Sequence, residues 1–207
     1  MHIPQPPPER DPDPVFLTLA IGSHLVRIYN PKPYSSGALT FRFNGPRARF
    51  DHQRAPADCP SDDSERGITY TSFNLSGCIV EVFGDERVIL CADWRAAYLT
   101  LTRPLKLLEL RNSGAMRAGT VSAIGSVEDR VITQKWSRYF YESPLFQEAD
   151  GLIFSNAHNG EPAIALYERA KTALKCGEQD SLRLDSQLLR ADIIHIAINN
   201  NLIGPIV

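Results

Sequence analysis

The chain has 207 residues, of which 43% are hydrophobic and 22% are charged. This composition is that of an ordinary globular protein and excludes a wholly disordered chain, a collagen-like repeat and a coiled coil. The 22 Lys and Arg residues and the 24 Asp and Glu residues give a net charge of -2, so nothing in the overall charge favours direct binding to nucleic acid or to an anionic membrane. No apolar run approaches the roughly 18 residues that a bilayer span needs, and the first residues do not resemble a signal peptide. We therefore expect a cytoplasmic protein.

The cysteines and histidines give no indication of a metal or redox site. The four cysteines are too few and too scattered for a disulfide framework, and no pair has the two-residue spacing of a zinc or thiol-redox motif. The five histidines are equally scattered. The sequence thus predicts reduced cysteines and no metal cofactor.

The N-terminal segment differs in composition from the rest of the chain. Six of the 15 prolines fall within residues 1–14, where they alternate with charged residues. Proline lacks the backbone N–H group, so this segment cannot form regular hydrogen-bonded structure. We predict a proline-rich tail or surface strap at 1–14 and a single domain at 15–207.

The first predicted strand after an apolar run at 15–21 is Leu25–Tyr29, in which apolar and polar residues alternate. The alternation places Arg27 on the strand face opposite Val26 and Ile28. A long irregular stretch follows from residue 30 to residue 67 and contains a basic and aromatic piece at 41–50. Connections of this length in a compact domain usually carry function or are partly disordered.

The next elements are a strand at 68–72 and a short helix at 75–83. Asn74 is a suitable N-cap for this helix, and Gly84 is expected to end it. The apolar positions of the helix share one face, which places Glu81 at the rim of that face. Gly77, one turn earlier, is expected to leave open space over the Glu81 carboxylate.

The remaining elements alternate between short strands and helices. We predict strands at 105–110, 151–155 and 163–167, a loop at 114–120, a helix at 127–141, and a helix from residue 182 that leads into an isoleucine-rich strand or helix ending near residue 198. This alternation indicates a mixed α/β or α+β fold and excludes an all-helical bundle.

Four short motifs in this order resemble the RES domain family, which is named for its Arg, Glu and Ser. The motifs are Leu25–Tyr29, Arg47–Asp51, the stretch from Ile68–Tyr70 through Cys78–Val82, and Asp150–Ser155. The resemblance runs from about Ser23 to Tyr167, which leaves 168–207 as a C-terminal extension. Trp136 adds to it, whereas His158 stands where relatives often carry a basic residue.

The resemblance implies a fold, an activity and partners. The fold is that of ADP-ribosyltransferases, a mixed α/β domain with a short split β-sheet flanked by helices. The activity is that of a bacterial toxin that consumes NAD as its substrate, by phosphorolysis with inorganic phosphate or by hydrolysis. The partners are a small helix-turn-helix antitoxin and, within the toxin–antitoxin complex, a second copy of the chain.

The chemistry of NAD cleavage agrees with the residues of these motifs, which we expect to line one pocket. Arginines hold phosphate groups through bidentate hydrogen bonds, a task that suits Arg27 and Arg49. A carboxylate such as Glu81 accepts a ribose hydroxyl and stabilises an oxocarbenium-like transition state. Tyr70 offers a ring face or a hydroxyl group to the substrate, and Ser155 offers a positioning hydrogen bond.

Two other functions stay open at this point. The same fold supports transfer of ADP-ribose to a protein side chain. Alternatively, the domain is a non-catalytic nucleotide-binding module. Glu81 also has an ordinary structural interpretation, a salt bridge to Arg27 or Arg87, because a buried carboxylate needs solvent or a partner. The arginines and phenylalanines of 41–50 resemble a platform for single-stranded nucleic acid, but an acidic loop follows them within ten residues and the net charge is negative.

Overall fold

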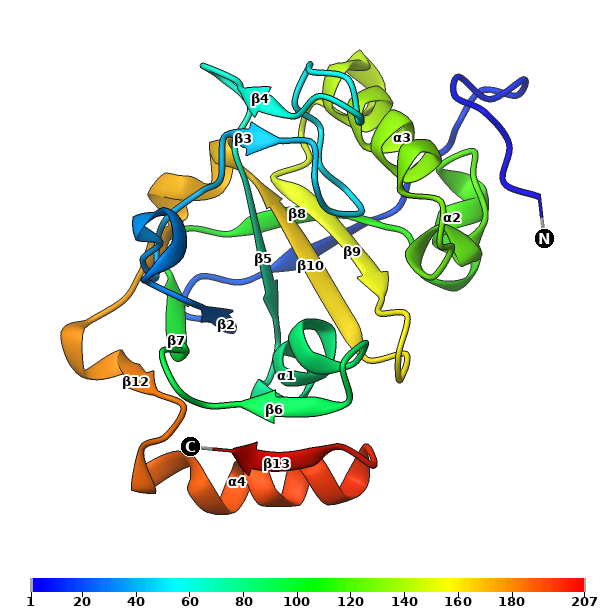
Figure 1. Ribbon diagram of the computed structural model, residues 1–207. Coiled ribbons are helices and arrows are strands. Elements are labelled where there is room, and N and C mark those ends of the chain that lie inside the picture. The colour runs from blue at the N-terminus through cyan, green and yellow to red at the C-terminus, as the bar shows by residue number, and fades with distance from the viewer. Residues whose placement is uncertain (1, 207) are drawn as a thin grey trace.

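The computed structural model describes residues 2–206 and shows a mixed α/β fold with a curled central sheet (Figure 1). The helices in this part of the chain are α1 (Leu75–Phe83), α2 (Asn112–Arg117), α3 (Arg130–Glu142) and α4 (Gln187–Asn199). Short 3₁₀ turns occur at Pro33–Ser35, Ser122–Gly125, Pro144–Phe146, Glu168–Ala173 and Glu178–Asp180.

Within the described residues, nine strands form the main sheet. They are β1 (Phe16–Leu19), β2 (His24–Tyr29), β5 (Ile68–Ser72), β7 (Arg95–Leu101), β8 (Leu105–Glu109), β9 (Gly151–Ser155), β10 (Pro162–Tyr167), β11 (Leu174–Lys175) and β12 (Ser181–Arg183). Their order is β1-β8-β9-β10-β5-β2-β7-β11, and β12 also pairs with β7. Of these pairs, β8 and β9 run parallel and the others run antiparallel.

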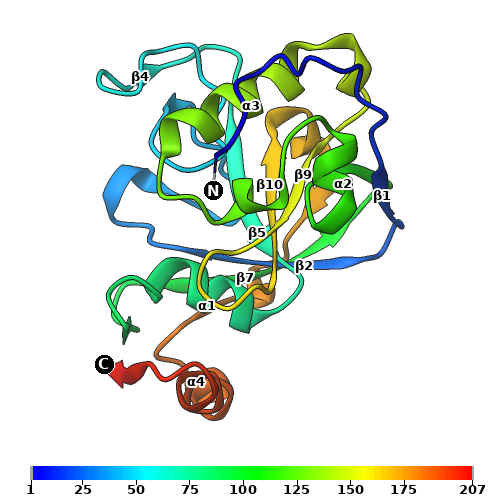
Figure 2. The ribbon, with the colours of Figure 1, turned by 90° about the vertical axis from the view of Figure 1, so that its right-hand side faces the viewer.

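Two small sheets lie beside the main sheet. One pairs β3 (Asn44–Gly45) with β4 (Ser61–Asp62) inside the long irregular stretch, and the other pairs β6 (Val88–Leu90) in parallel with β13 (Ile203–Ile206). Figure 2 shows α4 beside β13 at one end of the molecule, far from α2 and α3.

The two faces of the main sheet carry different layers. Strand residues paired directly opposite each other in an antiparallel sheet point to the same face, and Val26 pairs with Ser72, which in turn pairs with Ala163. This face is covered by α3, through Trp136 and Phe140, and by α1. Residues of the other face, among them Leu25, Tyr29, Ile153 and Ile164, pack against Phe41 and against the 3₁₀ turn after β10.

The N-terminal prolines lie along α2 and α3 as a strap. Ile3 is buried in the cluster that contains α3, and the Trp136 indole N–H donates a hydrogen bond of 2.7 Å to the Pro4 carbonyl. Farther along, Asp13 forms an ion pair of 2.6 Å with Arg117 on α2. The strap therefore joins α2 and α3 from outside, although its own backbone has no regular structure.

Several predicted boundaries change in the structure. The predicted loop at 114–120 is wrong for its first half, which belongs to α2 because Ala115 packs into the core. The predicted helix at 127–141 begins at Arg130, since the Asp129 side chain accepts hydrogen bonds from the Val131 and Ile132 N–H groups and so caps it. The C-terminal segment divides into β12, α4 and β13.

Candidate functional site

Helix α1 places Glu81 on the edge of the face that packs against the sheet. The Asn74 side chain accepts a hydrogen bond of 2.7 Å from the Gly77 N–H, which caps the helix as predicted. Apolar residues of α1, among them Cys78, Ile79 and Phe83, are buried against β2 and α4. Glu81 lies beside this buried stripe and is itself only partly exposed.

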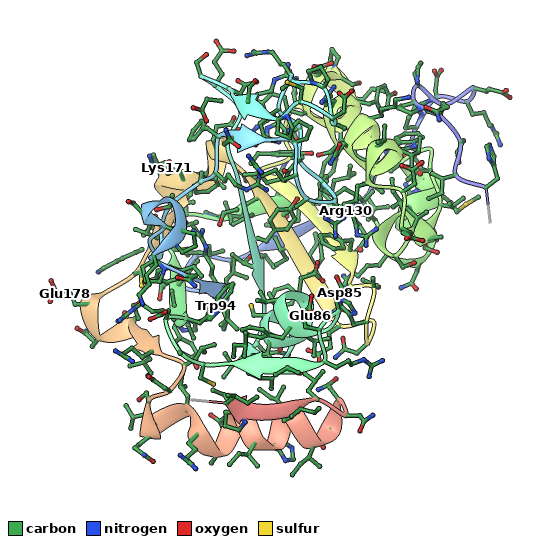
Figure 3. The ribbon with its side chains drawn as sticks, in the orientation of Figure 1. Asp85, Glu86, Trp94, Arg130, Lys171 and Glu178 are labelled. Carbon is green, nitrogen blue, oxygen red and sulfur yellow. The ribbon has the colours of Figure 1, made fainter. Side chains whose placement is uncertain are left out.

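Glu81 lines two neighbouring cavities. The larger, of about 620 Å³, is bounded by the side chains of α1, of the turn before α3 and of the loop between β9 and β10; its lining residues are Arg49, Glu81, Asp85, Ser126, Glu128, Arg130, Ala157 and His158. The smaller, of about 50 Å³, brings Glu81 together with Tyr70, Thr71 and Gly77. Figure 3 shows Arg130, at the start of α3, and Asp85, just after the end of α1, on the same side of the molecule.

The Glu81 carboxyl group is in an unusual electrostatic environment. Burial raises its pKa, and the positive charges of His158, Arg49 and Arg130 oppose this shift. Within residues 2–206, no basic nitrogen lies within 4.0 Å of the carboxylate, so the described structure shows no salt bridge to Arg27 or Arg87. Glu81 is thus a half-buried acid that faces positive charge across an open cavity, an arrangement common in active sites.

Arg49 belongs to a loop whose backbone is held by α3. Side chains of the helix donate hydrogen bonds to four successive carbonyls of this loop: Arg130 to Arg47 (3.4 Å), Gln134 to Ala48 (3.0 Å), Thr133 to Arg49 (2.5 Å) and Ser137 to Phe50 (2.6 Å). The Arg49 guanidinium also donates to the Val127 carbonyl. Burial lowers the pKa of Arg49, and the negative charge of Glu81 opposes the shift. The loop therefore presents Arg49 to the cavity from a fixed backbone.

Tyr70 supports the same loop from the sheet. Its hydroxyl group accepts a hydrogen bond of 3.0 Å from the Phe50 N–H and donates one of 2.9 Å to the Asp51 carboxylate. Burial raises the pKa of Tyr70 well above its ordinary value, and the charge of Asp51 adds to the shift. Tyr70 is therefore a neutral hydrogen-bonding group at the smaller cavity, where it joins Glu81.

The loop between β9 and β10 brings His158 to the cavity. The Asn156 side chain accepts hydrogen bonds of 3.0 Å from the N–H groups of His158 and Asn159, which fixes the turn. The His158 ring packs over Gly84, where a Cβ atom would lie 2.6 Å from a ring carbon. Gly84 keeps the right-handed helical conformation, so the glycine is required here for this close approach. His158 also lies 3.8 Å from the Asp85 carboxylate.

Arg27 and Ser155 lie apart from this group. Arg27 pairs with Ala97 on the sheet face that carries Leu25 and Tyr29, whereas α1 and Glu81 cover the opposite face. Its guanidinium donates hydrogen bonds to the Ala38 (3.2 Å) and Thr40 (2.5 Å) carbonyls, and burial lowers the pKa of Arg27 to about 10. Ser155 ends β9, as predicted, opposite Pro162. Neither residue is part of the lining of the two cavities.

The structure thus brings together Glu81 with Arg49 and Glu81 with Tyr70, but it does not place all five predicted residues in one pocket. Gly77 also differs from the prediction. A Cβ atom at Gly77 would lie 2.3 Å from the Ser72 hydroxyl oxygen, so the glycine allows α1 to pack closely on β5 and does not mainly leave open space.

Residues outside the predicted set complete the site. Arg130, Asp85 and Glu128 line the larger cavity, and Asp51 holds the Arg49 loop. Asp51 belongs to the second of the four motifs, Arg47–Asp51, so the sequence itself points to it. The others stand in segments whose spatial proximity no local pattern reveals.

Comparison with known proteins assigns the family. The sequence matches the RES domain over residues 24–187, which is most of the chain. The protein belongs to the RES domain family. The match includes Arg27, Arg49, Tyr70, Glu81 and Ser155, and it extends beyond the predicted end at Tyr167 as far as the first residue of α4.

A solved structure shares the fold of this RES domain. A chain in the crystal structure of the M. tuberculosis MbcT–MbcA toxin–antitoxin complex aligns with a TM-score of 0.54 and 12% sequence identity, over 84% of this chain and 90% of that chain. No match was found among the curated proteins. Within residues 2–206, no cluster of three or more His, Cys, Asp or Glu side chains is arranged to hold a metal ion. In the same part of the chain, no helix combines the length and apolarity of a membrane span.

Proposed function

We propose that this protein is a RES-domain toxin that cleaves the nicotinamide–ribose bond of NAD and is neutralised by an antitoxin. The observation that carries the proposal is the half-buried Glu81 carboxyl group, which faces Arg49 across a cavity of about 620 Å³. A cavity of this volume is within the ordinary range for small-molecule sites. Membership of the RES domain family supports the choice of NAD.

The cavity offers each charge that this reaction requires. The C1′–N bond breaks, its electron pair goes to the nicotinamide nitrogen and neutralises that cation, and positive charge develops on the ribose. Glu81 stabilises this charge and accepts a hydrogen bond from a ribose hydroxyl. Arg49 and Arg130 hold the pyrophosphate oxygens. Water or inorganic phosphate then supplies the oxygen that bonds to C1′, and in hydrolysis the proton of water leaves to Glu81 or to solvent.

The other predicted residues take supporting roles in this proposal. Tyr70 orders the Arg49 loop and borders the substrate beside Glu81. Arg27, on the opposite face of the sheet from Glu81, holds the segment at 38–40 through its two carbonyl contacts. Ser155 is the last residue of β9, from which the His158 loop begins.

The experiment follows nicotinamide release from NAD by purified protein, with and without inorganic phosphate. Release without any acceptor protein is expected, and phosphate dependence identifies phosphorolysis. Glu81→Gln is expected to lower the rate by about 100-fold or more, since removal of one stabilising group at a transition state typically has an effect of this size. Glu86→Gln is the matched control, because Glu86 is an exposed carboxylate near the same helix end and is not part of the cavity lining (Figure 3).

Three results would refute the proposal: no nicotinamide release, equal losses in the two variants, or label that appears only on an added protein. The last result would indicate ADP-ribosyl transfer instead. Expression in cells tests the toxin role, since the wild-type protein should arrest growth and Glu81→Gln should not.

We extend the proposal to a helix-turn-helix antitoxin and to two toxin copies in the complex. Co-purification of the neighbouring gene product, followed by mass measurement, tests both.

A further inference from the structure

Asp51 is a buried carboxylate at the base of the Arg49 loop. It is fully inaccessible to solvent. Its Oδ2 atom accepts hydrogen bonds from the backbone N–H groups of Arg47 (2.6 Å) and Ala48 (2.9 Å). Its Oδ1 atom accepts one of 2.9 Å from the Tyr70 hydroxyl, and the Arg42 guanidinium lies 2.9 Å from Oδ1 and 2.8 Å from Oδ2. A buried charge is tolerated when it is paired and hydrogen-bonded in this way.

The contacts of Asp51 complement those of α3. The helix binds the carbonyl groups of residues 47–50, whereas Asp51 and Tyr70 bind N–H groups of the same loop. The loop is therefore held through both its carbonyl and its N–H groups, and Arg49 lies between the anchored residues Ala48 and Phe50. Arg49 extends from it into the cavity that Glu81 lines.

We propose that Asp51 is a positioning residue for Arg49: it holds the loop at 47–50 so that the Arg49 guanidinium faces Glu81. Asp51 does not touch the cavity and acts only through the loop. This inference rests on the proposed function for its effect on catalysis, but its structural part concerns the loop alone.

Asp51→Asn is the informative substitution because it keeps the side-chain volume and removes the charge. An amide has one acceptor oxygen and one donor nitrogen. If the oxygen keeps the Arg47 and Ala48 N–H groups, the nitrogen faces the Arg42 guanidinium, donor against donor. If the amide turns over, it faces the two N–H groups instead. In the first orientation the Arg47 and Ala48 N–H groups keep their acceptor but lose its negative charge, which weakens both hydrogen bonds, and in the second orientation both hydrogen bonds are lost.

The first measurement is amide hydrogen exchange at Arg47 and Ala48, which needs no activity. We expect exchange in Asp51→Asn to be about tenfold or more faster than in the wild type, which is the change that loss of one to two hydrogen bonds gives. Asp150→Asn is the matched control. Asp150 is also buried, also pairs with an arginine (Arg103, 2.8 Å) and also accepts a hydrogen bond from a backbone N–H group (Lys106, 2.9 Å). Both partners lie at or just before the start of β8 and not in the loop at 47–50. Asp150→Asn should therefore leave amide exchange at Arg47 and Ala48 unchanged.

The second measurement is the kinetics of nicotinamide release. Asp51→Asn is expected to lower kcat/KM by about tenfold or more, because displacement of a binding group by about 1 Å can have a larger effect than this. In an Arg49→Ala background, Asp51→Asn should cause almost no further loss, since the group that it positions is absent. A purely structural role predicts the same loss in both backgrounds.

The outcomes separate this inference from the proposed function. If the wild type releases no nicotinamide, the proposed function fails, and hydrogen exchange together with a crystal structure of Asp51→Asn still decides whether Asp51 holds the loop and Arg49 in place. Unchanged exchange at 47 and 48 overturns the inference. So does faster exchange with unchanged kcat/KM, or an undiminished effect of Asp51→Asn in the Arg49→Ala background.

Discussion

The hydrogen bonds from α3 to the Arg49 loop should contribute measurably to the free energy of unfolding. Thr133 and Ser137 are fully buried, and their hydroxyl groups donate to the carbonyls of Arg49 (2.5 Å) and Phe50 (2.6 Å). The double variant Thr133→Val, Ser137→Ala removes both donors. Valine keeps the shape of threonine, and alanine lacks only the hydroxyl of serine, so the packing of α3 is retained.

The expected decrease in stability follows from the two hydrogen bonds that the Arg49 and Phe50 carbonyls lose. Each intramolecular hydrogen bond contributes about 1 kcal/mol, and a buried group left without a partner costs about 1 to 3 kcal/mol. The two carbonyls are adjacent in one loop and relax together, so the two effects should add incompletely. We therefore expect the free energy of unfolding to fall by about 2 to 4 kcal/mol in the double variant.

Urea denaturation followed by tryptophan fluorescence measures this change, because Trp136 lies fully buried on α3. Thr102→Val is the control: the exposed Thr102 hydroxyl also donates to a carbonyl, that of Thr172, at 3.2 Å. An exposed site of this kind should change stability by no more than about 0.5 kcal/mol. A double variant that loses no more than the control would refute the reasoning that α3 fixes the loop through these bonds.

Three further predictions concern α1 and the N-terminal strap. Gly77→Ala should lower the free energy of unfolding by about 1 to 2 kcal/mol in urea denaturation, because the 2.3 Å approach to Ser72 outweighs the gain of about 1 kcal/mol in helix propensity. Burial raises the pKa of Glu81 above its ordinary value of 4.5, so the wild type loses stability as the pH rises from 4.5 through the raised pKa. Glu81→Gln should therefore raise the free energy of unfolding at neutral pH, and this gain should vanish as the pH falls below 4.5. Trp136→Phe should lower the free energy of unfolding by more than about 1 kcal/mol, because it removes the hydrogen bond to the Pro4 carbonyl and leaves part of a fully buried site unfilled, and it should make the strap more sensitive to protease.

Each of these has a result that contradicts it. An alanine at position 77 that stabilises the protein would mean that α1 shifts away from β5 at little cost. A Glu81→Gln gain that is equal at pH values above and below 4.5 would show that the ionised carboxylate carries no burial cost. A Trp136→Phe variant with the cleavage pattern of the wild type in limited proteolysis would show that the strap is held by other contacts, such as the buried Ile3 side chain.

The local elements around the site could be predicted because their signals are local. The strand at β2 follows from alternation, and α1 follows from its apolar spacing and from the Asn74 cap, both of which depend on neighbours within one or two turns. The same is true of the position of Glu81 on the rim of α1. The start of α3 was predicted three residues early, because an apolar residue at 127 continues the helical spacing although Asp129 caps the helix.

The relation between Arg27 and Glu81 required the tertiary structure. Both belong to the short motifs on which the resemblance to the RES domain rests, and alternation alone predicts the face of β2 that carries Arg27. Which face α1 covers depends on the order β10-β5-β2-β7 and on the register that pairs Val26 with Ser72. These are contacts between residues tens of positions apart, so no window of sequence contains them.

The amino-acid sequence by itself determined the family, the mixed α/β class and the elements that carry Arg49, Tyr70 and Glu81, because these follow from residue order, spacing and caps. Only the tertiary structure decided that Glu81 faces Arg49 and His158 across one cavity, that Arg27 lies on the other face of the sheet, and that Asp51 and α3 hold the Arg49 loop. The reason is physical: burial, charge proximity and the satisfaction of backbone hydrogen bonds arise only when distant segments pack together.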